Sequence, residues 1–91
     1  MLNNEQRIRI FKALADETRL VIIRELYAKK NEMSCGELRE ICGTTKSNAS
    51  YHFRTLSETN LIKIRKESQT KYASLNLETF DLYLPGFLNT L

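Results

Sequence analysis

The chain is poor in the residues that interrupt helices. One proline and three glycines occur in 91 residues, which favours a mainly helical fold. No charged-then-apolar leader of the signal-peptide kind follows the first methionine, and charges recur too often for a transmembrane run. We therefore expect a cytoplasmic protein without a membrane partner, in which the two cysteines remain thiols.

Signatures of enzymes are also missing from the sequence. It contains no P-loop, GxSxG, HExxH or dinucleotide-binding fingerprint. His52 is the only histidine, and no candidate ligands or nucleophile stand near it in the sequence. We expect no enzymatic activity, no cofactor and no metal site, and we assign His52 a structural hydrogen bond or a phosphate contact.

Positive charge is concentrated in one segment. Residues 44–76 hold six Lys or Arg against two Asp or Glu, whereas residues 1–43 hold eight against seven. Residues 77–91 carry Glu78 and Asp81 and no basic residue. A basic central segment suits a nucleic-acid partner, although a solvated surface would have a similar composition.

Capping signals divide the first half of the chain into helices. Asp16 predicts the start of one helix, and Ser34, with a glutamate three residues later, forms a capping box for the next. Gly43 predicts the end of that helix, and Thr44 or Thr45 starts another almost at once. This short joint is typical of a helix-turn-helix. In the helix before the joint, we expect Leu38, Ile41 and Cys42 to face inward.

The following segment reads as a helix and a basic hairpin. Apolar residues at helical spacing, Ala49, Phe53 and Leu56, predict the buried side of a helix from about 46 to 59. Asn60 can adopt the left-handed conformation that ends a helix. Two alternating segments then flank a turn at residues 68–69.

Together these elements predict a winged helix-turn-helix, mainly α with a small β-hairpin in the order α-α-α-α-β-β-α. We place a single domain at 1–91, terminal helices at about 4–15 and 77–90, the helix-turn-helix at about 34–59 and the wing at about 61–75. Asn76 is a candidate cap for the last helix, and Pro85-Gly86 should break or kink it. Asn and Arg can pair with bases, and Ser, Thr and Lys suit phosphates. The residues expected to bind DNA are Thr45, Lys46, Ser47, Asn48, Ser50, Tyr51, Arg54, Lys63, Arg65, Lys66, Gln69 and Lys71.

Two motifs connect the chain to a known family. Ser50, His52 and Phe53 form an SxHF signature, and Asp16 and Arg19 form a D-x-x-R element within FKALADETRLVIIREL. With the helix order and the basic hairpin, they resemble the ArsR-type winged-helix regulators. The resemblance implies a homodimer on a roughly palindromic operator, and repression of its own operon until an inducer binds. It also implies a dimer surface on the first and last helices, here Ile8, Phe11, Phe80, Leu84, Phe87 and Leu88.

The chain departs from the metal-sensing members of that family. Their cysteine pair in the third helix aligns with Ser34 and Gly36, and the last helix lacks histidine. The inducer is therefore unknown. Cys35 and Cys42 leave a thiol- or metal-responsive sensor as an alternative, because a helix start at Cys35 would favour a thiolate. A second alternative is a winged-helix module that docks proteins.

Overall fold

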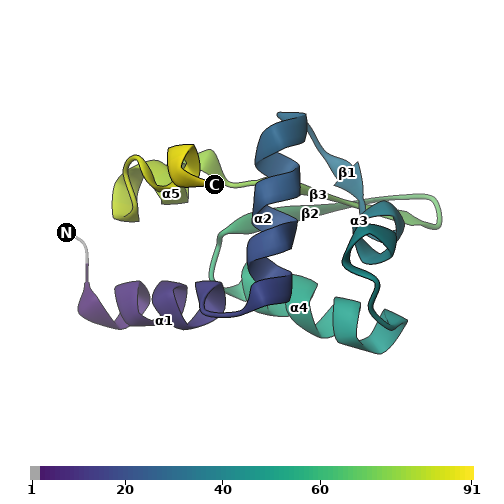
Figure 1. Ribbon diagram of the computed structural model, residues 1–91, viewed down its shortest axis with the longest axis horizontal. Coiled ribbons are helices and arrows are strands. Elements are labelled where there is room, and N and C mark those ends of the chain that lie inside the picture. Colours follow the sequence, from purple (N-terminus) through teal and green to yellow (C-terminus); the bar gives the residue numbers. More distant parts are fainter. Residues whose placement is uncertain (1–2) are drawn as a thin grey trace.

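The computed structural model describes residues 3–91 and contains short helices around a small sheet (Figure 1). Three antiparallel strands lie in the order β1-β3-β2. In chain order the elements are α1 (Asn4–Leu14), α2 (Glu17–Lys29), β1 (Met33–Ser34), α3 (Cys35–Cys42), α4 (Lys46–Glu58), β2 (Ile62–Glu67), β3 (Thr70–Leu75), α5 (Leu77–Tyr83) and the 3-10 helix η1 (Phe87–Thr90).

The predicted caps start the helices. Side-chain oxygens of Asp16, Ser34 and Thr45 accept hydrogen bonds from backbone N–H groups three residues later, in α2, α3 and α4. Gly43 ends α3 in the left-handed conformation, at φ 63°, and Asn60 follows α4 at φ 61°. Both positions favour residues that tolerate positive φ, so the helix-turn-helix and its exit follow from local sequence.

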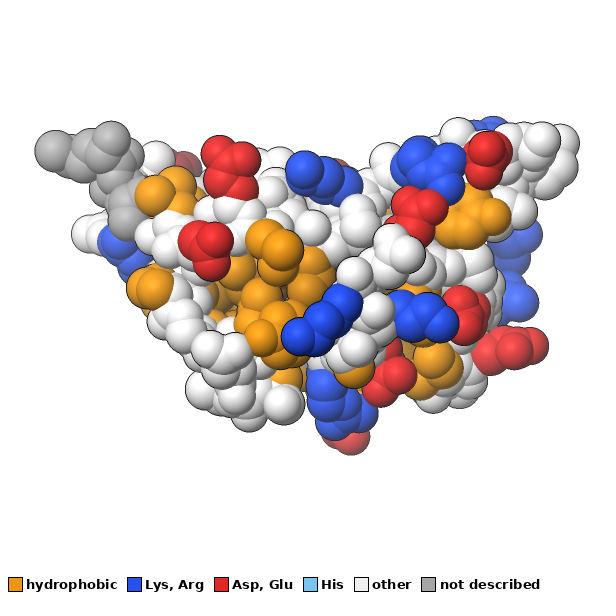
Figure 2. Space-filling model, turned by 90° about the horizontal axis from the view of Figure 1, so that it is seen from above, with side chains coloured by type: hydrophobic (Ala, Val, Ile, Leu, Met, Phe, Trp, Pro, Cys, Tyr) orange, Lys and Arg blue, Asp and Glu red, His pale blue; other side chains and the backbone are white. Residues whose placement is uncertain are grey.

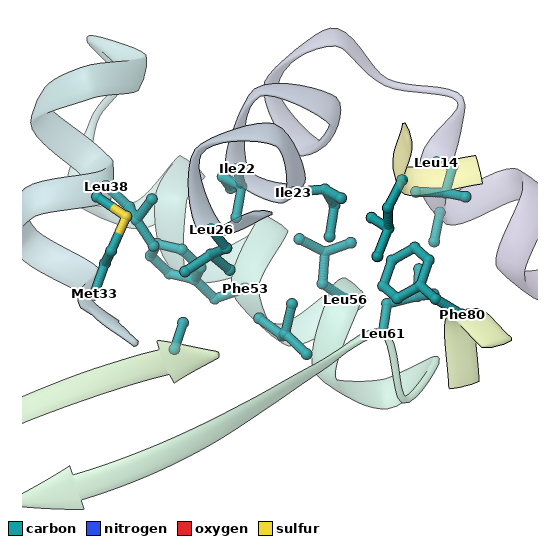
Figure 3. Packing of buried hydrophobic residues seen from close by; sticks show 14 of the residues in the cluster. Leu14, Ile22, Ile23, Leu26, Met33, Leu38, Phe53, Leu56, Leu61 and Phe80 are labelled. Carbon is teal, nitrogen blue, oxygen red and sulfur yellow. The ribbon is translucent and has the colours of Figure 1, made fainter. Parts of the chain in front are cut away.

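The core joins all layers of the fold (Figure 3). Ile23 of α2 points toward Leu56 of α4, Leu26 of α2 lies beside Phe53, and Leu61 lies where the chain leaves α4. On α4 the predicted inward residues, including Ala49 and Phe53, are buried. Several other buried residues come from elements far apart in the sequence: Ile10, Leu14, Met33, Leu38, Ala73, Phe80 and Leu88.

Three expectations need correction. The sheet has a third strand, because Met33 and Ser34 pair with Ala73 and Tyr72 of β3. Ile41 is 46% exposed instead of buried. Asn76 precedes α5 but makes no side-chain capping bond.

The terminal helix is broken at Pro85-Gly86, as expected. The segment 77–90 is not one continuous helix: α5 ends at Tyr83, and η1 starts after Gly86, whose φ is 83°. Proline at 85 cannot donate the backbone hydrogen bond that would continue a helix, so the chain breaks there. The two short pieces lie on the same side of the molecule as α1, away from the hairpin of β2 and β3 (Figure 1).

Candidate nucleic-acid interface

Helix α4 presents a polar side to solvent. Its side chains Lys46, Ser47, Asn48, Ser50, Tyr51 and Arg54 are all exposed, as is Thr45 at its cap. The opposite side is anchored in the core through Ala49, Phe53 and Leu56. All the residues of α4 that we predicted to contact DNA therefore lie on the surface.

A groove runs between this helix, α3 and the wing, which we define as residues 62–75. It encloses about 820 Å³. Its lining includes five basic side chains against one acidic one, Glu58, and the basic ones are Arg39, Lys46, Arg54, Lys66 and Lys71. We call it the basic groove. The excess of positive charge would suit a polyanion.

Two lysines of the wing stand directly opposite each other. Lys66 of β2 pairs with Lys71 of β3 in the antiparallel register, and both line the basic groove. Like charges in this arrangement destabilise a hairpin. Bound phosphates would remove that repulsion, and lysines on an exposed hairpin also prevent its edge from pairing with other chains.

Neighbouring residues of β2 project from the other side of the sheet. Lys63 and Arg65 alternate with Ile62, Ile64 and Lys66, so they lie on the wing face away from the basic groove. Lys63 is exposed. The predicted wing residues therefore divide into two sets, of which Lys66, Lys71 and Gln69 line the groove beside α4.

Arg65 is already bound within the protein. Its Nε donates to Glu32 Oε2 at 3.2 Å, and its Nη2 donates to the other oxygen of the same carboxylate. Nη1 lies 3.3 Å from Glu67 Oε2, and the guanidinium carbon lies 4.7 Å from the centre of the Tyr72 ring. The hydrogen bond from Arg65 lowers the pKa of Glu32 below its ordinary range.

His52 makes the structural hydrogen bond that was one of our two expectations for it. Arg19 of α2 donates through Nη1 to His52 Nδ1 at 3.0 Å, and through Nε to the Ala13 carbonyl at 2.6 Å. A guanidinium can only donate, so Nδ1 accepts. Asp16 caps α2 at the backbone N–H of Arg19, 3.0 Å away, and this bond is the main cause of its lowered pKa.

Neither cysteine has the lowered pKa on which the alternative of a thiol-responsive sensor depended. Burial raises the pKa of the Cys35 thiol, and the nearby Lys71 charge only partly opposes this shift. Burial also raises the pKa of Cys42. With both pKa values raised, both cysteines are protonated thiols at neutral pH. Within residues 3–91, no group of three or more His, Cys, Asp or Glu residues could hold a metal ion.

The residues predicted for the dimer surface differ in their exposure to solvent. Ile8 and Phe11 of α1 are 52% and 51% exposed, but Phe80 and Leu88 are buried in the protomer core. Of these four residues, Ile8 and Phe11 are therefore the ones with surface to offer a partner. Leu84 and Phe87 are half-buried.

No helix of the described residues is long and apolar enough to span a bilayer.

Sequence reasoning missed Arg39 and Glu32. Arg39 lines the basic groove from α3, and Glu32 holds Arg65 from the loop before β1. A basic residue four positions before the helix-turn-helix turn was a usable signal for Arg39. Nothing local signals Glu32, because its partner lies 33 residues away.

The known proteins that this chain resembles are helix-turn-helix proteins and regulators of transcription. Residues 14–65 match a family model described as a helix-turn-helix domain. The chain is 56% identical to the uncharacterized HTH-type transcriptional regulator YceK of Bacillus subtilis (strain 168), over 98% of this chain and 89% of that one. It is 41% identical to the arsenical resistance operon repressor of the same organism, over 75% of this chain and 64% of that one.

A solved structure has the same architecture. It is the homodimeric winged helix-turn-helix DNA-binding domain of a Mycobacterium bovis protein, described as a possible ArsR-family transcriptional regulator. The two chains superpose with a TM-score of 0.76 at 25% identity, over 87% of this chain and 72% of that one.

Proposed function

Because the chain belongs to the ArsR-type family of winged helix-turn-helix transcriptional regulators, we propose that it is a repressor that binds its operator through the basic groove. DNA binding and regulation of transcription come with the family. The direction of regulation and the binding surface are the proposal. Repression is supported by the similarity to the arsenical resistance operon repressor.

One observation carries the choice of surface. Lys46, Ser50 and Arg54 on the exposed side of α4 line the same groove as the Lys66–Lys71 pair of the wing, so helix and hairpin can hold one duplex together. We assign Asn48, Tyr51 and Arg54 to base edges. They lie on the exposed side of α4, and the major groove of DNA is wide enough to admit an α-helix. The groups assigned to phosphates are Thr45, Lys46, Ser47, Ser50, Lys66, Gln69 and Lys71.

We propose a homodimer as the binding unit. Ile8 and Phe11 leave an apolar strip on α1, beside the terminal segment 77–91, and the M. bovis relative is described as homodimeric. Figure 2 shows hydrophobic side chains gathered on the half of one face that lies away from the wing. Two symmetric recognition helices would then read a roughly palindromic operator.

Two alternative functions, protein docking and thiol-based sensing, receive less support. The exposed side of α4 is polar apart from Tyr51, whereas a protein-docking helix would present an apolar strip. A thiol-based signal would need a reactive thiolate, and burial raises the pKa of both cysteines. We therefore propose an operator-binding repressor whose releasing signal is unknown.

Fluorescence anisotropy with DNA from upstream of its own gene tests the proposal. We expect tighter binding to this duplex than to a scrambled duplex of equal length, at both 50 mM and 200 mM salt. Equal and strongly salt-sensitive binding to the two would leave only non-specific affinity. Failure to bind either duplex would instead favour protein docking.

A further inference from the structure

Arg65 is the best-satisfied basic side chain on the wing. Both oxygens of Glu32 accept its N–H groups, Glu67 Oε2 forms an ion pair with it at 3.3 Å, and the Tyr72 ring covers one face of the guanidinium. Isolated surface ion pairs contribute little, but a bidentate pair within a network is the exception. To bind a phosphate, Arg65 would first have to break these contacts.

The contacts of Arg65 cross the sheet. Arg65 belongs to β2, Tyr72 to the central strand β3, and Glu32 to the loop that leads into β1 on the far side of β3. The ion pair therefore spans all three strands. Since β1 runs directly into α3, the contact ties the wing to the first helix of the helix-turn-helix.

The wing needs such a tie. Every residue from Lys63 to Lys71 is exposed, so the core holds only the base of the hairpin. The Lys66–Lys71 pair also repels itself across the two strands. A hairpin with so little buried area would otherwise be free to change its angle to α4.

Charge on the outer face of the wing also argues against DNA contact there. Lys63 and Arg65 are balanced by Glu32 and Glu67, whereas the basic groove on the other face keeps its excess of positive charge. Figure 2 shows basic and acidic side chains interspersed at the wing end of the visible face.

We propose that Arg65 is a positioning residue: with Glu32 and Tyr72 it clamps the wing at the angle that presents Lys66 and Lys71 to DNA. This proposal rests on the proposed function, because it assumes that the basic groove binds the duplex. It replaces our expectation that Arg65 itself binds DNA.

Glu32→Gln distinguishes Arg65 as a clamp from Arg65 as a DNA ligand. If Arg65 were a DNA ligand, release from Glu32 would free it for phosphate and tighten binding. If it is a clamp, Glu32→Gln and Arg65→Gln should both weaken operator binding, by about twofold to fivefold, the size that one such ion pair supports. Anisotropy titrations at a series of salt concentrations give both the affinity and its salt dependence.

The salt dependence provides the second readout. Each lost phosphate contact should reduce the slope of log K against log salt by about 0.9. We expect this reduction for the control Lys66→Gln. For Glu32→Gln and Arg65→Gln we expect an unchanged slope, because Lys66 and Lys71 still contact phosphates once the looser wing is bound, and only the cost of ordering the wing rises. The reversed pair, Glu32→Arg with Arg65→Glu, should restore affinity. A lower slope in Arg65→Gln, or tighter binding by Glu32→Gln, would overturn the clamp.

Hydrogen exchange without DNA distinguishes failure of the clamp from failure of the proposed function. Glu32→Gln should speed amide exchange in the wing and leave α2 unchanged, whatever the protein binds. Unchanged exchange in the wing would refute the clamp even if the wild type binds its operator normally. Faster exchange in a wild-type protein that binds no DNA would instead refute only the proposed function.

Discussion

At the scale of single residues, Arg19 links the two halves of the molecule. It is only 9% exposed, yet its charge is satisfied by the Ala13 carbonyl and His52. Its backbone N–H also completes the cap of α2 at Asp16. The D-x-x-R element and the histidine of SxHF therefore belong to one network, which joins the end of α1 to the recognition helix α4.

Removing the cap should destabilise the fold. We expect Asp16→Ala to lower the free energy of unfolding by about 1–2 kcal/mol, the usual effect of a lost helix cap. Asn76→Ala is the matched control, because Asn76 occupies a cap position without a side-chain capping bond. Urea denaturation of both variants measures the difference, and equal losses would contradict this account.

The same carboxylate predicts a pH dependence. The pKa of Asp16 is lowered from its ordinary value of 3.8, so its ionised form is favoured in the folded state. Its stabilising effect is present above that value and is lost as pH falls through the lower, folded-state pKa. The stabilities of wild type and Asp16→Ala should therefore converge at acid pH. A constant difference from pH 7 to pH 2 would exclude this role.

Arg54 provides a test of base reading. It is exposed and borders the basic groove. If it reads a base, Arg54→Ala should cost about 1–3 kcal/mol of operator binding and relax the preference at one position. Arg24→Ala, which removes an exposed arginine from α2, is the control and should have no such effect. A uniform loss across all sequences would assign Arg54 to a phosphate.

At the scale of elements, α1 contacts the C-terminal end of α4. Gln6 donates to the Thr59 carbonyl at 3.3 Å, and Arg9 donates to the Glu58 carbonyl at 3.5 Å. These bonds satisfy carbonyls at the end of α4, while Thr45 caps its start. The recognition helix is therefore fixed at both ends before DNA is bound.

Elements with local signals could be predicted from the sequence. Caps at Asp16, Ser34 and Thr45, the turn at Gly43 and the exit at Asn60 each depend on a residue's own conformational preference. The exposed side of α4 followed from its periodicity. Most of the helix-turn-helix and its candidate site was therefore visible in the chain.

Features that depend on distant partners could not be predicted. Strand β1 has two residues and exists only through its pairing with β3. The commitment of Arg65 to Glu32 depends on how the sheet places two segments side by side. Burial of Phe80 likewise reflects packing of α5 on the core, which helical periodicity cannot distinguish from packing on a partner.

The exit from α4 can be tested by the conformation it requires. Asn60 has a φ of 61°, where a side chain with a Cβ and no local hydrogen bond is disfavoured. Asn60→Ala should lower the free energy of unfolding by about 1 kcal/mol, whereas Asn60→Gly should not lower it. Thermal unfolding of the two variants provides the comparison. A more stable alanine variant would be incompatible with the backbone described.

At the scale of the whole molecule, the proposed surfaces are separated. The wing lies at one end, and α1 and the terminal segment lie at the other (Figure 1). The contacts of Gln6, Arg9 and Arg19 with α4 connect these ends through α1 and α2. A change at a dimer surface on α1 could therefore alter the position of the recognition helix.

The dimer proposal makes a direct prediction. Phe11→Glu places a charge on the exposed strip of α1 and should convert a dimer to a monomer without unfolding it. Ile41→Glu makes the same kind of change on α3, at a residue 46% exposed, and should leave the mass unchanged. Light scattering after size exclusion measures both. A dimeric Phe11→Glu variant would remove α1 from the interface.

The most direct test of the central claim compares two charge-matched double variants on the operator. Lys66→Gln with Lys71→Gln removes two charges from the basic groove, and Arg24→Gln with Lys29→Gln removes two exposed charges from α2. We predict that the groove variant lowers the salt slope by about 1.8 and the α2 variant leaves it unchanged. Relief of the lysine repulsion should keep the groove variant folded. Equal slopes for the two variants would contradict the basic groove as the DNA-binding surface.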